Sequence, residues 1–134
     1  PVKEIRQIKE GSGFVTEAGE HIGHDELTTS PPAPRSYAFC TDTVPHEPAA
    51  AFIQSVNLLY HEATFMTDMQ NWAEKTLHST ARQAAEFALR AQAKQLIIGH
   101  FSTRYKTVQP FLVEARSVFP DTLLAQDGEK YRVV

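Results

Sequence analysis

Several side chains of this sequence that can bind a metal ion stand directly after short apolar runs. Three such runs lead into Asp42, the pair His61-Glu62, and His100. In open α/β sheets, ligands bind beyond the carboxyl ends of the strands, so we expect these residues to lie together. Carboxylates and imidazoles are among the ligands that hold zinc. The pattern therefore indicates a metal-dependent hydrolase.

His78 is a further candidate, because it stands just before the point where Ser79 and Thr80 are expected to begin a helix. Each of these residues alone also has an ordinary explanation. An Asp after a strand is commonly a turn or cap residue, and a single His is commonly a hydrogen-bonded structural residue. Taken together, Asp42, Glu62, His78 and His100 predict one cluster at one edge of a sheet.

The elements that must position these residues are short strands alternating with helices from Tyr37 onward, a pattern typical of an α/β fold with a largely parallel or mixed sheet. The expected strands are 37–41, 57–60 and 95–99, with weaker ones at 122–125 and 131–134.

Two helices are expected between these strands. An apolar stripe at helical spacing predicts the first over 80–93, and Thr80 with Gln83 forms a capping-box pattern at its start. The second should run from Pro110 to Phe119, because proline suits the first turn of a helix.

The first 36 residues form a separate, β-rich lead-in, with reversals at Gly11 to Gly13 and at Gly19. The proline-rich stretch 28–34 should be an extended connection, because proline disfavours both helices and inner strands. We therefore divide the chain into a lead-in, 1–36, and an α/β region, 37–134.

Composition limits the size of the core and the cellular environment that we expect for this protein. The 134 residues are 42% hydrophobic, enough for one packed core. Cys40 is the single cysteine, so no internal disulfide can form, and no apolar run approaches the ~20 residues that span a bilayer. We expect a soluble, cytoplasmic protein without a membrane segment. Because the sequence starts at Pro1 with no signal-peptide pattern, we expect it to be part of a longer protein.

The net charge of −3 gives no field that attracts a polyanion. A local basic excess occurs near the start of the chain, at Lys3, Arg6 and Lys9, and we interpret it as the exposed face of a strand. Charge alone therefore gives no support to nucleic-acid binding.

Four stretches of the sequence resemble the ordered motifs of ribonuclease Z, the tRNA 3′-end endonuclease of the metallo-β-lactamase fold. They are Phe39-Cys40-Thr41-Asp42-Thr43, His61-Glu62-Ala63-Thr64-Phe65, His78-Ser79-Thr80 and His100-Phe101-Ser102-Thr103-Arg104-Tyr105. The resemblance covers nearly the whole chain, because the lead-in is similar to the segment that follows the family's tRNA-binding arm. The second and third motifs distinguish this family from other metallo-β-lactamase relatives.

The resemblance implies a role for each site residue. Asp42 is implied to be the carboxylate that bridges two zinc ions, and His100 a terminal ligand of one of them. His78 is implied to donate a proton to the departing 3′ oxygen, with Glu62 hydrogen-bonded to it and orienting its ring. His61 is expected to support the strand end rather than to bind metal.

Two arginines could contact substrate phosphates. Arg104 could do so through its planar fork, although an Arg just after a strand is as often a loop anchor. Arg35 has the same two interpretations. Leu77, before His78, stands where members of the family often carry glycine.

The family's His-x-His-x-Asp-His motif does not occur in this sequence, and His21 to Asp25 imitates it only superficially. Asp42 and His100 are fewer ligands than the three that a catalytic zinc normally keeps. We therefore expect the C-terminal half of an αββα sandwich, with a mixed sheet covered by helices, that is inactive alone. The full-length protein should bind two zinc ions, cleave the 3′ trailer from precursor tRNA and form a homodimer.

Two other functions stay open at this point. One is a different metallo-β-lactamase-fold phosphodiesterase that acts on small diesters. The other is a non-enzymatic α/β interaction domain in which the motifs serve only the structure. An upstream His-x-His-x-Asp-His motif would exclude the interaction domain, and a basic arm before Pro1 would disfavour small diesters.

Overall fold

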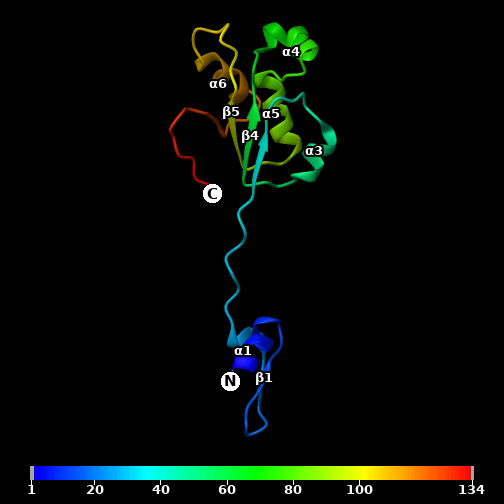
Figure 1. Cartoon of the computed structure of the whole chain (residues 1–134), viewed down its shortest axis with the longest axis vertical. Helices are drawn as coiled ribbons and strands as arrows, with labels where there is room; N and C mark the ends of the chain where they lie inside the picture. Colours follow the sequence, from blue (N-terminus) through cyan, green and yellow to red (C-terminus); the bar gives the residue numbers. More distant parts are fainter. Residues whose placement is uncertain (1, 134) are drawn as a thin grey trace. The chain divides into compact units, whose positions relative to one another are not determined.

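The structure, a computed structural model, describes residues 2–133. The chain divides into two compact units, Pro1–Pro34 and Arg35–Val134. Figure 1 shows the elements of each unit, coloured along the sequence. Residues 28–36 form no helix or strand, in agreement with the extended connection that the prolines predict.

The first unit begins with a helix, α1 (Val2–Lys9), where the sequence analysis expected a strand. The interpretation of Lys3, Arg6 and Lys9 as one face of a strand is wrong, because intervals of three residues match the period of a helix rather than that of a strand. An ion pair between Arg6 Nε and Glu10 Oε1, 2.9 Å long, supports the helical turn.

The remainder of the first unit is a small hairpin followed by one short helix. Strands β1 (Phe14–Val15) and β2 (His21–Ile22) pair antiparallel, and α2 (His24–Leu27) follows them. Gly19, in the connection between the strands, has a φ of +82°, a conformation that glycine adopts without steric cost. With α1 present, the β-rich description of 1–36 holds only for this hairpin.

The second unit contains, among the described residues, a four-stranded sheet in the order β3-β4-β5-β6. Every pairing in this sheet is parallel, so the mixed sheet that we expected from the sequence is wrong for the described residues. The carboxyl ends of all its strands therefore lie at the same edge. The strands are β3 (Tyr37–Cys40), β4 (Leu58–Glu62), β5 (Gln95–Gly99) and β6 (Thr122–Leu124).

The strand expected at 131–134 is absent over 131–133, and Val134 lies outside the described residues. A side chain fixes this segment instead of a ladder of backbone bonds. The Tyr131 hydroxyl donates to Leu124 O at 2.7 Å and accepts from Gln126 N at 3.0 Å.

Helices cover one face of this sheet. They include α3 (Glu47–Phe52), α5 (Ala81–Arg90) and α6 (Gln109–Arg116), whose apolar residues share a core with Leu59, Leu96 and Ile98 of the strands. The predicted capping box of α5 is confirmed: Thr80 Oγ1 accepts from Gln83 N, and Gln83 Oε1 accepts from Thr80 N. No helix among residues 2–133 has the length and apolar character needed to cross a membrane.

The opposite face of the sheet carries exposed aromatic side chains. Tyr37 and Phe39 are more than half exposed, and Phe39 stacks on Tyr60 with ring centroids 4.6 Å apart. Aromatic surface of this kind is commonly buried by association.

The turn between α4 (Gln70–Thr76) and α5 places His78. The residue that caps the end of α4 is Leu77, whose φ of 60° and ψ of 40° are left-handed. The next residue closes the turn, because His78 N donates to Ala73 O at 2.9 Å. Glycine is favoured in this conformation, which explains physically why a glycine would suit position 77.

We predict that Leu77→Gly raises the free energy of unfolding by about 0.5–1 kcal/mol, because the left-handed conformation costs an L-residue about 1–2 kcal/mol and glycine's extra freedom in the unfolded chain offsets part of the gain. Urea denaturation measures the change. Leu77→Ala keeps the Cβ atom and should change stability far less. A destabilised Leu77→Gly variant would show that the exposed Leu77 side chain contributes more than its backbone costs.

Candidate metal centre and active site

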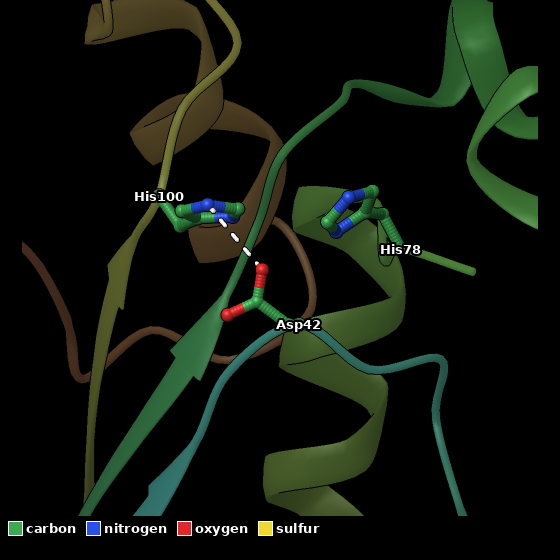
Figure 2. A group of neighbouring side chains, drawn as sticks. All are labelled: Asp42, His78 and His100. Carbon is green, nitrogen blue, oxygen red and sulfur yellow. Dashed lines mark ion pairs between the residues drawn. The ribbon is translucent and has the colours of Figure 1, made fainter. Parts of the chain in front are cut away.

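The carboxyl ends of neighbouring parallel strands bring the predicted site residues together. Asp42 follows β3, Glu62 ends β4, and His100 follows β5 directly. Figure 2 shows Asp42, His78 and His100 pointing toward one another from three separate segments. Asp42 Oδ1 lies 3.6 Å from His100 Nε2. The cluster therefore lies at the edge of the sheet that the strand ends predicted.

Asp42, His78 and His100 could together hold a metal ion. One ligand atom from each lies within 4.8 Å of those of the other two, the one such group found among the described residues. Two atoms that bind one tetrahedral zinc ion at about 2.0–2.2 Å lie roughly 3.3–3.6 Å apart, so the group would have to close by about an ångström to hold one ion. One carboxylate and two imidazoles also match the ligand preference of zinc.

The backbone is left-handed at two of these residues. The φ angle is 49° at Asp42 and 61° at His100, and neither residue is a glycine. Such conformations cost about 1–3 kcal/mol each and cluster at functional sites, where the surrounding structure imposes them. His100 comes directly after β5 and Asp42 two residues after β3, so each turn redirects the chain at the site.

Glu62 lies under the cluster and is fully buried. Its Oε1 accepts from Thr43 N and from His78 Nδ1, both at 2.7 Å. Its Oε2 accepts from Thr64 Oγ1 at 2.5 Å, Ser79 N at 3.2 Å and Thr64 N at 3.3 Å. All five bonds are accepted, as an ionised carboxylate requires. One buried side chain thus connects three segments of the site.

His78 has one ring nitrogen committed and one facing the cluster. Nδ1 donates to Glu62, which leaves Nε2 as the atom that can hold a proton or a metal ion. The side chain is 22% exposed, and its ring centroid lies 5.4 Å from that of His100. The geometry alone allows either role.

His61 does not join the cluster, because neighbouring residues of a strand point to opposite faces of the sheet. Its ring is buried in the core 4.7 Å from the Phe87 ring, and Nδ1 donates to Glu62 O at 2.7 Å. Nε2 has no hydrogen-bond partner in the described part of the chain. Burial lowers the pKa of His61 below its ordinary value of 6.5.

The two arginines fall in different places. The Arg104 guanidinium lies 5.7 Å from the Trp72 ring and 6.0 Å from the Phe65 ring, and the Phe65 ring in turn lies 6.2 Å from that of His78. Arg104 therefore borders the site. Arg35 precedes the amino end of β3, whereas the cluster lies at the carboxyl ends, so the structure does not bring Arg35 to it.

Comparison with curated proteins shows close relatives over almost the whole chain. It is 47% identical over 133 residues to the ribonuclease Z of Parabacteroides distasonis, covering 99% of the chain and 44% of that protein. It is 49% identical over 127 residues to the ribonuclease Z of Porphyromonas gingivalis strain W83, covering 95% and 42%. The chain is homologous to ribonuclease Z. It spans less than half the length of these ribonuclease Z relatives.

Solved structures confirm the predicted fold class. A metallo-β-lactamase fold protein from Bacillus subtilis matches 68% of this chain and 37% of its own, with a TM-score of 0.62 and 22% identity. The short form of human tRNase Z matches 66% of this chain and 29% of its own, with a TM-score of 0.52 and 28% identity. No family model matches the sequence. The α/β unit is thus part of a metallo-β-lactamase fold of the kind found in ribonuclease Z.

Thr64 had no predicted role, although it belongs to one of the ribonuclease Z-like motifs. The structure places its hydroxyl between Glu62 and both histidines of the cluster. A spacing of two residues from Glu62 was the available signal, because residues i and i+2 of an extended chain point the same way.

We predict that Glu62→Gln lowers the free energy of unfolding by about 2–3 kcal/mol, since an amide NH₂ group must then face donors that a carboxylate satisfied. Urea denaturation measures the loss. Glu86→Gln, which removes an exposed partner of Arg82, should cost less than about 0.5 kcal/mol. Equal small effects in both variants would contradict the structural role of Glu62.

We also predict a pH dependence from His61. Its pKa is lowered in the folded chain, so below about pH 6.5 the unfolded chain binds more protons and stability falls with falling pH. Urea denaturation at about pH 8 and about pH 5.5 should show a larger loss in wild type than in His61→Gln. The same loss in both proteins would mean that His61 titrates normally when folded.

Proposed function

We propose that this chain is the C-terminal half of a metal-dependent endoribonuclease that removes the 3′ trailer of precursor tRNA by phosphodiester hydrolysis. The observation that carries the proposal is the convergence of Asp42, His78 and His100 above the buried Glu62. Relatives at 42–49% identity are named ribonuclease Z, which does not favour a small-diester phosphodiesterase or a non-enzymatic domain.

In this proposal Asp42 and His100 bind metal in the full-length protein, Asp42 as the carboxylate that bridges two zinc ions. The two oxygens of a carboxylate can span such a pair. Asp42 and His100 are both exposed, which leaves room for further ligands from outside this chain. A bound metal pair supplies an activated water and stabilises charge on the attacking and leaving oxygens. The incomplete ligand set makes the fragment inactive alone.

His78 acts as the proton donor to the departing 3′ oxygen. The bond from Nδ1 to Glu62 fixes the ring and leaves the proton for transfer at Nε2. Glu62 does not touch the substrate in this assignment and acts by positioning His78. These two roles explain why the buried Glu62 carboxylate binds the ring of His78, which also faces the cluster.

Arg104 contacts a phosphate of the RNA beside the site, while most of the affinity for RNA resides outside this chain, whose net charge is −3. Arg35 receives no role, given its place at the amino end of β3. The full-length protein acts in the cytoplasm as a homodimer.

The test uses variants of the full-length protein. His78→Ala should keep its zinc content and slow the chemical step by about 10²–10⁴-fold, the usual effect of losing a general acid. Asp42→Ala should lose zinc. Metal analysis and single-turnover cleavage of precursor tRNA give the two readouts, and His46→Ala, an exposed histidine outside the cluster, serves as the control.

The opposite pattern, zinc lost from His78→Ala and retained by Asp42→Ala, would overturn the roles assigned to the two residues. Zinc-dependent cleavage by the purified 134-residue chain, absent from an Asp42→Ala preparation made in parallel, would show that this chain forms a complete active site.

A further inference from the structure

Thr64 lies at the centre of the site, yet it belongs to neither the proposed ligands nor the proposed proton donor. It follows β4 by two residues and is 7% exposed. Its Oγ1 lies 2.5 Å from Glu62 Oε2, 2.9 Å from His100 Nδ1 and 3.3 Å from His78 Nδ1. A single hydroxyl therefore touches three of the four residues that were predicted to form the cluster.

The direction of these hydrogen bonds follows from counting protons. Backbone N–H groups of Thr43, Thr64 and Ser79 can only donate, and all three are directed at the Glu62 carboxylate. Glu62 thus acts as an acceptor toward Thr64 as well. A hydroxyl has one proton to donate, and Thr64 donates it to Glu62 Oε2, its shortest contact.

The oxygen of Thr64 can then only accept from His100. The hydrogen bond of 2.9 Å consequently requires a proton on His100 Nδ1. In a neutral ring the other nitrogen, Nε2, carries the lone pair. This Nε2 is the atom that lies 3.6 Å from Asp42 Oδ1, on the side of the cluster.

We infer that Thr64 is a positioning residue whose hydroxyl holds His100 in the Nδ1–H tautomer, with the Nε2 lone pair directed at the cluster. His78 Nδ1 is held directly by Glu62, so both rings are anchored through Nδ1 to the same carboxylate, one of them by way of Thr64. The tautomer of His100 is inferred from these contacts alone. That this tautomer prepares Nε2 to bind metal rests in addition on the proposed function.

A Thr64 that acted only through packing would need its methyl group and its volume, not its hydroxyl. Thr64→Val keeps the shape and removes the hydroxyl, whereas Thr64→Ser keeps the hydroxyl and removes the methyl group. The two variants therefore separate packing from hydrogen bonding, and Ser is the conservative variant expected to rescue.

The decisive measurement is a long-range ¹H–¹⁵N spectrum of the histidine-labelled chain at about pH 8, without added metal, where an ordinary imidazole is neutral. His100→Gln identifies the signals of His100. Wild type and Thr64→Ser should show a protonated Nδ1 and an unprotonated Nε2 at His100. Thr64→Val should lose this pattern at His100 and keep a protonated Nδ1 at His78.

An Nε2–H tautomer of His100 in wild type would overturn the inference even if Thr64→Val failed to fold. So would a folded Thr64→Val variant with an unchanged His100 signal, or a folded Thr64→Ser variant that loses the pattern. Because this readout uses neither metal nor RNA, it is independent of whether the proposed function is correct.

A second readout concerns metal binding by the full-length protein. Loss of a group that orients a metal-binding histidine typically weakens metal affinity by about 10–100-fold. Competition with a zinc chelator should show a weakening of this size in Thr64→Val and little change in Thr64→Ser. Equal affinities in Thr64→Val and wild type would contradict the role of Thr64 in preparing His100 for metal.

Discussion

A buried carboxylate organises this site. Placing the Glu62 charge in the interior is costly unless every lone pair finds a donor, and five donors meet it from the segments after β3 and β4 and before α5. Each donor lies beside a residue of the cluster or belongs to it. Thr43 adjoins Asp42, Ser79 adjoins His78, and Thr64 contacts His100. The electrostatic requirement of one side chain therefore fixes the geometry of three others.

The same network explains how left-handed backbone conformations persist at Asp42 and His100. Thr43 N is bound to Glu62, and Ser79 Oγ donates to Thr43 O at 2.7 Å, which fixes the chain just after Asp42. On the two sides of His100, Ala63 N donates to Gly99 O at 2.8 Å and Ser102 N donates to Thr64 O at 3.0 Å. Bonds that flank a strained residue impose its conformation, so both turns are set by contacts made within this chain.

The sequence predicted the part of the fold that depends on local pattern. Residues that follow apolar runs proved to be neighbours, because the strands are parallel and their ends must share an edge. The helix α1 was missed because intervals of three were interpreted as alternation, and the segment at 131–133 because a side-chain hydroxyl holds it. The role of Thr64 depends on partners up to 36 positions away, and the spacing from Glu62 alone does not reveal those partners.

Asp42 and His100 are the proposed metal ligands, and this network prepares them for the metal. Anomalous diffraction at the zinc edge, from crystals of the full-length protein grown with zinc, tests it most directly. We expect zinc peaks about 2.0–2.2 Å from the Asp42 carboxylate and from His100 Nε2, with His100 Nδ1 still hydrogen-bonded to Thr64. Zinc bound elsewhere in the protein, with Asp42 and His100 free of metal, would contradict it.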